Sequence, residues 1–177
     1  KIKNITELNL DTISTANSPD ISNFIYLKKL KGLGGGTNSS ITELKLEDFS
    51  GSLEFLSKST QLEHLTLSIS SYSSDKVESL DSFKHLVSLR ELVLSPAKLT
   101  DINFLSECKK LQKLNLTVDE RYSYGDVKVN DITVLSNLKN LEELSISGIH
   151  PGLDIRPIGN CKKLKNLNIV FNDESTM

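Results

Sequence analysis

Three histidines are the first residues to consider for chemistry, because imidazole serves both as a metal ligand and as a general base. His64 falls in an expected strand, His85 in an outer segment and His150 in a loop, and none has a partner at zinc-ligand spacing. Serine is abundant, but no G-x-S-x-G nucleophile elbow occurs. The adjacent Glu142 and Glu143 lie on a strand and diverge, so they do not form a general acid/base pair. We therefore expect no catalytic activity, no metal and no cofactor.

A glycine run, Gly34 to Gly36, lies within the stretch GLGGGTNSS. Backbone N–H groups of such a run can cradle a phosphate, but neither P-loop nor dinucleotide-binding spacing follows it. We interpret residues 32–40 as a flexible turn.

The charge balance excludes several classes of partner. The 177 residues include 21 Lys and Arg against 23 Asp and Glu, a formal net charge of -2, so no global field gathers nucleic acid or anionic lipid. No apolar run approaches the roughly 18 residues that cross a bilayer, and the N-terminus lacks a charged-then-apolar signal pattern. A stripe of cations precedes the repeated leucines, and we interpret it as a solvated face: Lys28, Lys29, Lys109, Lys110, Lys139, Lys162 and Lys163.

One repeat organises the chain. Counted from Asp101, apolar residues follow at six positions: Ile102, Leu105, Cys108, Leu111, Leu114 and Leu116. The same frame fits from Asp131 and from Asp154. Weaker copies start at three further residues: Asp20, Ser52 and Ser79. The leading Asp or Ser can cap the turn that follows it through a side-chain oxygen.

Each copy runs into the pattern L-x-x-L-x-L: ITELKL, LEHLTL, LRELVL, LQKLNL, LEELSI and LKNLNI. Its strand leucines stand at 44, 65, 92, 114, 144 and 167, at intervals of 21, 27, 22, 30 and 23 residues. A basal unit of about 22 falls within the roughly 20 to 29 residues of leucine-rich repeats. The run LRELVLSPAKLTDINFLSECKKL resembles the 22-residue repeat of bacterial internalin-type proteins. Leu99, Asp101 and Ile102 stand where that pattern has them, and Ala97 stands in place of its Asn.

The resemblance implies an α/β solenoid, a right-handed leucine-rich-repeat superhelix. Its parallel sheet is concave, and short helical or 3-10 turns form the convex side. One unit alone cannot bury its leucines, so units stack and share a core. We expect a single domain over 1–177, with irregular repeats over 1–40, regular repeats over 41–171 and a tail over 172–177. About seven strands are expected, centred on Leu8, Leu44, Leu65, Leu92, Leu114, Leu144 and Leu167, with a degenerate strand at Leu33.

Cys108 and Cys161 occupy the same position two units apart. At about 4.7 to 4.9 Å per strand they lie on the order of 10 Å apart, beyond the reach of a disulfide. We expect free, buried and inert thiols. They favour an intracellular location over the cell surface or secretion, whereas three Asn-x-Ser/Thr triplets, at Asn4, Asn38 and Asn115, favour secretion.

Strand alternation turns a polar set of side chains toward the concave face. The set is mixed in sign, with several acidic members: Glu43, Lys45, Glu47, His64, Thr66, Ser68, Glu91, Val93, Ser95, Lys113, Asn115, Thr117, Glu143, Ser145, Ser147, Asn166 and Asn168. A partner surface with basic groups would suit it, and binding would then weaken with salt.

The stretch DERYSYGDVKVN, residues 119–130, holds about eight residues more than the basal unit requires. The stretch SISSYSSDKVES is a second surplus, of about five, one repeat earlier. Tyrosine is enriched in binding hot spots because it offers a large contact area with few rotors. A solvated loop is the alternative, since Ser, Asp, Gly and Lys dominate both stretches. We predict that Tyr72, Arg121, Tyr122 and Tyr124 form the rim of a partner site.

Three classes of function remain: recognition module, enzyme and structural spacer. An enzyme needs a convergent cluster of titratable residues, which the sequence lacks, and a spacer needs no long insertions. We therefore predict a non-catalytic module that binds another protein through its concave face and its loop insertions. The alternative is a sensor or regulatory domain cut from a larger receptor, defence or surface protein.

Overall fold

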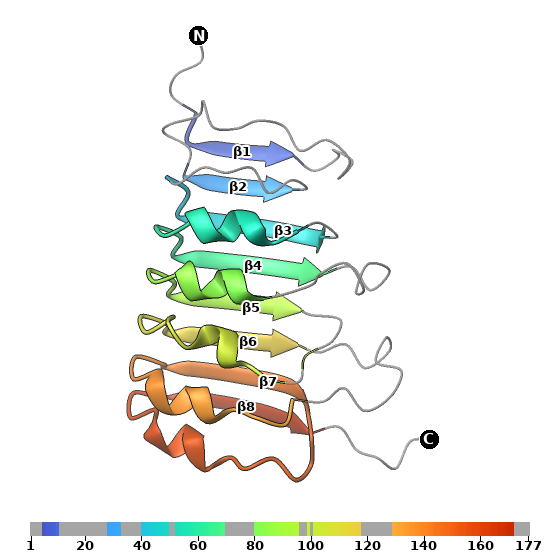
Figure 1. The fold of residues 1–177 in the computed structure, drawn as a ribbon, viewed down its shortest axis with the longest axis vertical. Helices are drawn as coiled ribbons and strands as arrows, with labels where there is room; N and C mark the ends of the chain where they lie inside the picture. Colours follow the sequence, from blue (N-terminus) through green and yellow to red (C-terminus); the bar gives the residue numbers. More distant parts are fainter. Residues whose placement is uncertain are drawn as a thin grey trace.

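The computed structural model describes residues 5–10, 28–32, 40–49, 52–69, 80–95, 99, 101–117 and 129–171. Within these residues, eight strands form one parallel sheet whose spatial order follows the chain (Figure 1). The strands are β1 (Glu7–Leu10), β2 (Lys29–Gly32), β3 (Glu43–Phe49), β4 (His64–Ile69), β5 (Glu91–Ser95), β6 (Lys113–Thr117), β7 (Glu143–Ile149) and β8 (Asn166–Phe171). The predicted leucine-rich-repeat solenoid is confirmed.

The repeated leucines become the core because strand side chains alternate between the two faces of the sheet. In β4, residues His64 to Ile69 alternate strictly between half-buried and buried. The first leucines of the L-x-L pairs stack in register from strand to strand, as Leu65, Leu92 and Leu114 do. One face of the sheet is thereby apolar and packed, and the other carries the polar residues between the leucines.

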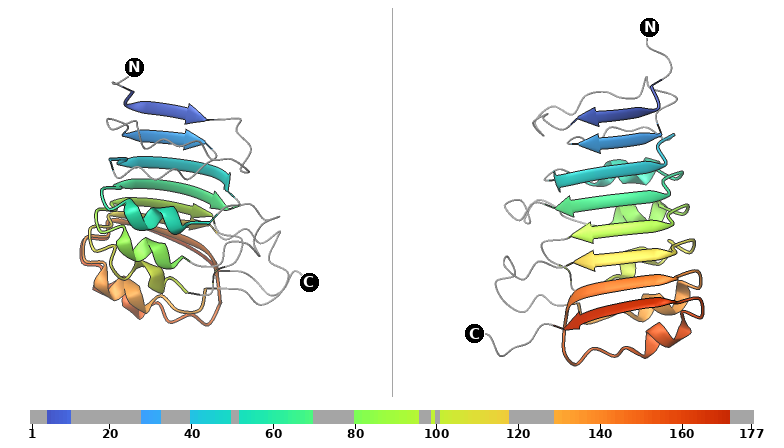
Figure 2. Two further views of the ribbon diagram at one scale, coloured as in Figure 1. Left: turned by 45° about the horizontal axis from the view of Figure 1, so that its top comes forward. Right: turned by 180° about the vertical axis from the view of Figure 1, so that it is seen from behind.

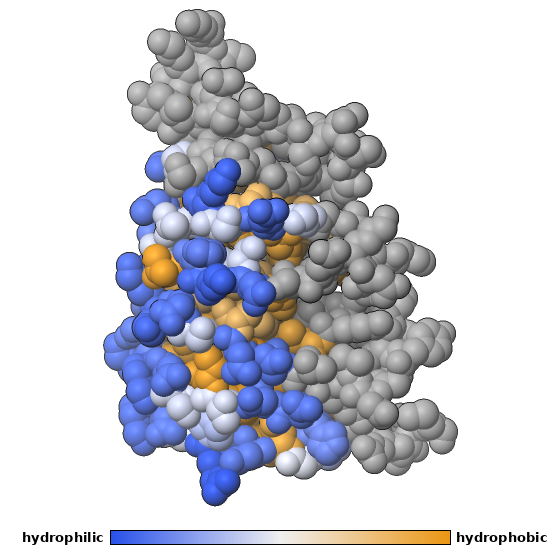
Figure 3. Space-filling view, viewed as in Figure 1, coloured by the Kyte–Doolittle hydropathy of each residue, from blue (hydrophilic) through white to orange (hydrophobic). Residues whose placement is uncertain are grey.

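Short 3-10 helices cover the packed face. They are η1 (Glu54–Lys58), η3 (Asp81–His85), η4 (Asn103–Leu105), η6 (Thr133–Asn137) and η7 (Arg156–Asn160). In the segments that contain these helices, buried residues recur at three-residue spacing, as Ile102, Leu105, Cys108 and Leu111 do, which suits three residues per turn. Figure 2 shows that these helices lie on one side of the sheet, so the other face is free of them. Over the described part of the convex side, hydrophilic side chains surround narrower apolar strips (Figure 3).

Four of the six predicted Asp and Ser caps are present, and the other two, Asp20 and Ser79, lie outside the described residues. The carboxylate of Asp101 accepts the backbone N–H of Asn103 at 2.9 Å, and that of Asp131 accepts the N–H of Thr133 at 2.8 Å. The Asp154 carboxylate and the Ser52 hydroxyl accept equivalent bonds, at 3.0 and 3.2 Å. Each cap satisfies a donor at the start of a turn that would otherwise be unpaired.

A second repeated device aligns the start of every strand. One carbonyl in each unit accepts two consecutive N–H groups from the next unit, in seven successive steps: Thr6, Lys28, Thr42, Glu63, Arg90, Gln112 and Glu142. In the first step, the Lys28 and Lys29 N–H groups donate to the Thr6 carbonyl at 2.8 and 3.0 Å. Because the same bonds recur, equivalent residues of neighbouring units lie side by side.

The N-terminal repeats differ from the prediction. The second strand is centred on Leu30, not Leu33, and Leu30 pairs with Leu8 on one side and with Leu44 on the other. The sheet therefore has one strand more than the seven full ones expected. The frame counted from Asp20 puts Leu33 at the first strand leucine, three residues after Leu30, which holds that position in the structure. Lys28 directly precedes β2, and Lys29 is its first residue.

Candidate functional site

The free face of the sheet is the candidate site, and it carries seven of the predicted partner-binding residues. Glu43 and Lys45 lie on β3, His64 on β4, Glu91 on β5, Lys113 and Asn115 on β6, and Glu143 on β7. All are at least partly exposed between the buried leucines. The other four, Tyr72, Arg121, Tyr122 and Tyr124, lie outside the described residues.

Register brings the first polar residue of each strand into one line across the sheet, which we call the charge row. Its members in order are Glu7, Lys29, Glu43, His64, Glu91, Lys113, Glu143 and Asn166. Acidic residues occupy every odd-numbered strand, and a basic residue or an amide occupies every even one. The row therefore has a carboxylate on every second strand and is not a continuous acidic stripe.

The members of the charge row pair with their neighbours at different distances. The Lys29 ammonium contacts the Glu43 carboxylate at 2.8 Å, and this hydrogen bond raises the pKa of Lys29. The Glu91 carboxylate lies 3.2 Å from His64 Nδ1 and 3.6 Å from Lys113 Nζ. The same Lys113 nitrogen lies 3.6 Å from Glu143. Pairing is close at Glu43 and loose around Lys113.

A flanking row of residues, one position earlier in each repeat, is also paired across strands. Arg90 lies 3.4 Å from the Glu63 carboxylate. Lys165 contacts Glu142 at 2.6 Å, a bond that lowers the pKa of Glu142 and raises that of Lys165. All four side chains are partly or largely exposed, so these pairs contribute little to stability. They determine the positions of the charged groups along the border of the concave face.

Beyond the charge row runs a neutral row over the last three strands, formed by Asn115, Ser145 and Asn168. The Asn168 amide donates to the Ser145 hydroxyl at 3.2 Å, and the Thr117 hydroxyl donates to the Asn115 carbonyl oxygen at 3.2 Å. A primary amide has two donor hydrogens and an acceptor oxygen. Both asparagines thus retain hydrogen-bonding capacity that faces solvent.

These two rows line a shallow hollow of about 590 Å³ over β5 to β8. Its polar lining residues are Glu91, Lys113, Asn115, Glu143, Ser145, Lys165, Asn166 and Asn168. The exposed Val93 adds apolar surface. This volume falls within the roughly 300 to 1,000 Å³ of ligand-binding pockets. Sequence reasoning found most of the lining residues but did not predict that they enclose a hollow.

The histidines lie where the sequence placed them. His64 is on the concave face, His85 is in η3, and His150 follows β7, where its Nδ1 accepts the N–H of Gly152 at 3.0 Å. Within the described residues, no three His, Cys, Asp or Glu side chains gather as a metal site would require. In the same part of the chain, no helix is long and apolar enough to cross a bilayer.

Both cysteines are free and buried, as predicted. The Cys108 thiol faces the Phe83 carbonyl oxygen at 3.6 Å, and the Cys161 thiol faces that of Leu135 at 3.3 Å. Burial raises the pKa of Cys108 to about 12 and also raises the pKa of Cys161. Because the thiolate is the nucleophile, neither residue is poised to react.

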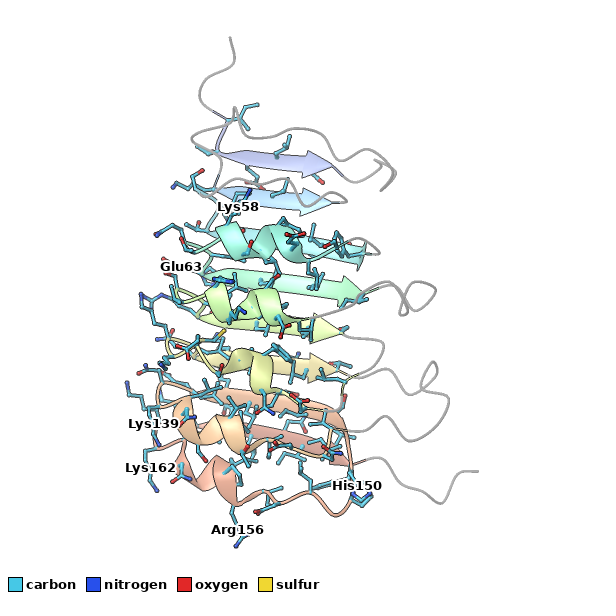
Figure 4. All side chains as sticks on the ribbon, viewed as in Figure 1. Lys58, Glu63, Lys139, His150, Arg156 and Lys162 are labelled. Atoms are coloured by element: carbon cyan, nitrogen blue, oxygen red, sulfur yellow. The ribbon has the colours of Figure 1, made fainter. Side chains whose placement is uncertain are left out.

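The predicted lysine stripe is solvated. All seven of its members are exposed, and Lys139 and Lys162 project from the edge where the strands begin (Figure 4). Lys29 is the exception in position, since its side chain joins the charge row. The Lys163 ammonium donates to the Asn140 side chain at 2.8 Å. The stripe thus lies along a border of the sheet and outside the hollow.

Comparison with solved structures supports the fold. An internalin (inlF) from Listeria monocytogenes matches with a TM-score of 0.55 and 24% identity, covering 89% of this chain and 53% of that one. Internalin C2 of the same organism matches with a TM-score of 0.65 and 21% identity, covering 97% and 75%. A leucine-rich-repeat protein from Leptospira interrogans matches with a TM-score of 0.60 and 16% identity, covering 93% and 42%.

No protein-family model matches the sequence, and no curated protein matches it. The chain spans about half the length of the inlF internalin. Its fold is a leucine-rich-repeat solenoid and resembles that of the internalins.

Proposed function

We propose that the chain is a non-catalytic recognition module that binds another protein through its concave face and its loop insertions. The observation that supports this most is the hollow over β5 to β8, where the sheet holds half-exposed polar side chains next to the exposed Val93. A recognition surface needs this combination of fixed backbone, hydrogen-bonding groups and apolar area.

A protein partner fits the face better than nucleic acid does. The charge row has a carboxylate on every second strand, so phosphates laid along it would repeatedly meet like charge. The formal net charge of -2 adds no general attraction for a polyanion. We propose one recognition domain over 1–177, with regular repeats over 41–171.

Site-specific crosslinking tests which face binds. A photoreactive p-benzoylphenylalanine replaces Asn115 on the concave face or, as the matched control, Lys84 on the convex side; both residues are exposed. We expect the Asn115 variant to capture a protein from the native source and the Lys84 variant not to. Binding of that protein, once purified, is then measured by calorimetry. Equal capture at both positions would refute recognition by the concave face.

The insertions extend the same proposal to a rim made by Tyr72, Arg121, Tyr122 and Tyr124. We expect Tyr122→Ala and Tyr124→Ala each to weaken partner binding by more than about 1 kcal/mol, as at hot spots, while changing the free energy of unfolding by less than about 0.5 kcal/mol. Calorimetry and chemical denaturation measure the two effects. Unchanged affinity after deletion of residues 119–127 would show that the insertion is a solvated loop and not part of the site.

A further inference from the structure

The carboxylates of the hollow are incompletely neutralised. Glu91 and Glu143 share one ammonium, that of Lys113, and Glu91 also lies 3.2 Å from His64 Nδ1 on its other side. Lys165 also lines the hollow, but it is held by Glu142 at 2.6 Å, and Arg90 at the border is held by Glu63 at 3.4 Å. The charge row over β5 to β7 thus carries two carboxylates against one ammonium.

The shared contacts are also long. At 3.6 Å, each carboxylate lies beyond the roughly 2.7 to 3.2 Å range of an N–H···O hydrogen bond to Lys113. Lys29 and Glu43 occupy equivalent positions in the same row. There the Lys29 ammonium lies only 2.8 Å from the Glu43 carboxylate. The hollow therefore presents two carboxylates that one cation reaches but does not hydrogen-bond closely.

Exposure leaves the pair accessible to a ligand. The Glu91 and Glu143 side chains are 42% and 46% exposed, and Lys113 is 50% exposed. Lys113 can therefore swing out of its position toward solvent. The position of its nitrogen marks a point from which a single cationic group reaches both carboxylates.

We propose that the hollow seats an arginine side chain of the partner protein, with its guanidinium between Glu91 and Glu143. This rests on the proposed function, because the arginine belongs to the protein that the concave face recognises. A guanidinium has five N–H donors in a planar fork and is less strongly hydrated than an ammonium, so it can hydrogen-bond two carboxylates at once. The amides of Asn115 and Asn168 lie beside it and can bond the polypeptide that carries the arginine.

Lys113 then acts as an internal competitor. It occupies the space between the carboxylates in the free protein and repels an incoming cation. Its removal is expected to strengthen arginine binding, whereas an acidic side chain bound by Lys113 and Lys165 would be weakened by the same change. The sign of the Lys113 effect therefore identifies the charge of the ligand.

The test is a titration of the ¹⁵N-labelled chain, observed by amide NMR, with the peptide acetyl-Gly-Arg-Gly-amide. We expect shift changes concentrated at residues 91–93, 113–115 and 143–145 that saturate and that weaken with salt. The citrulline peptide, which is neutral and has nearly the same shape, and the Glu peptide are expected not to bind. Glu91→Gln and Glu143→Gln should each weaken arginine binding roughly threefold or more, and Lys113→Gln should strengthen it about twofold.

Glu54→Gln is the control variant, because Glu54 is an exposed carboxylate of η1, on the opposite side of the sheet from the hollow; its arginine affinity should be unchanged. Amide shifts far from each substitution report that the variant is folded. Absence of arginine binding, equal binding of the citrulline peptide, or weaker binding in Lys113→Gln would each overturn the proposal. Capture of a partner at Asn115 together with any of these results would refute the arginine site alone, whereas arginine binding without concave-face capture would refute the proposed function.

Discussion

The same residue type at the same repeat position has different burial in the middle and at the end of the solenoid. Leu144 in β7 is 2% exposed, whereas Leu167, its register partner in β8, is 52% exposed. Both belong to an L-x-L pair and both point to the side of the core. The difference is that β7 packs between two strands of the sheet and β8 against one. Burial in this fold is thus conferred by the next unit, not by local sequence.

The largest expected effect is the loss of stability when an interior leucine is truncated. Leu144→Ala removes a fully packed side chain and should lower the free energy of unfolding by about 2 to 5 kcal/mol, the range for leucines in cores. Leu167→Ala removes a half-exposed side chain and should cost less than about 1 kcal/mol. Urea denaturation followed by circular dichroism measures both. Equal losses would mean that the end repeat is as well packed as the interior.

Leu114→Ala serves as a second interior variant, since Leu114 is also 2% exposed. Neighbouring units share the core, so its loss should match that of Leu144→Ala. An unchanged denaturation midpoint in either interior variant would contradict the burial that the register gives them.

The sequence predicted the regular part of the fold closely, because each strand leucine needs the same spacing to reach the shared core. One repeat pattern was enough to predict which strand residues are buried and which face the concave side. The same pattern predicted the caps and the buried thiols. The frame failed at Leu30, where only fourteen residues separate the strand leucine from Leu44. An interval that short has no room for the full outer segment. A prediction that assumes complete units of about 22 residues therefore misses the strand at Leu30.

The candidate site was predicted less completely than the fold. Its residues were found from strand alternation, but their pairing depends on register between strands that lie far apart in the sequence. Aligning the residue before each strand leucine would have revealed the alternation of Glu43, His64, Glu91 and Lys113, so the signal was present. The hollow was not predictable, because it arises from how side-chain lengths and contacts combine across four strands.

An effect of intermediate size is expected in the reactivity of the two cysteines, one in the interior of the solenoid and one in its last described unit. Cys108 is fully buried between units, whereas Cys161, at the equivalent position of the last unit, is 5% exposed. Burial raises the pKa of Cys108 to about 12, and for Cys161 Lys139 partly opposes the rise. Fewer contacts must open to expose the end unit, so Cys161 should react with iodoacetamide roughly tenfold faster than Cys108.

Mass spectrometry of timed, quenched samples at pH 8 resolves the two thiols, and Cys161→Ala assigns them. Denaturant should equalise the two rates, because the difference belongs to the folded state. Faster labelling of Cys108 would show that the interior opens before the end, against the order that packing predicts.

The smallest effect on stability is expected from the caps. The group that stabilises the cap carboxylate differs between Asp131 in the interior and Asp154 at the end. The Thr133 backbone N–H lowers the pKa of Asp131, whereas the Arg156 side chain, followed by the Arg156 backbone N–H, lowers that of Asp154 to about 2. A carboxyl whose pKa is lower in the folded state stabilises the fold above its unfolded pKa, and this contribution disappears as the pH falls through the folded value. For Asp154 the window runs from the ordinary value of 3.8 down to about 2.

Asp154→Asn and Asp131→Asn each keep an acceptor oxygen while removing the charge. Both variants should unfold at slightly lower denaturant than the parent at pH 7, and the difference should close as the pH falls through these windows. Salt should reduce the deficit of Asp154→Asn, because an exposed ion pair with Arg156 is screened, and should affect Asp131→Asn less, because a backbone dipole is its main partner. Denaturation midpoints at low and high salt measure the contrast. An identical salt response in the two variants would show that the end cap, like the interior one, depends on its backbone hydrogen bond and not on Arg156.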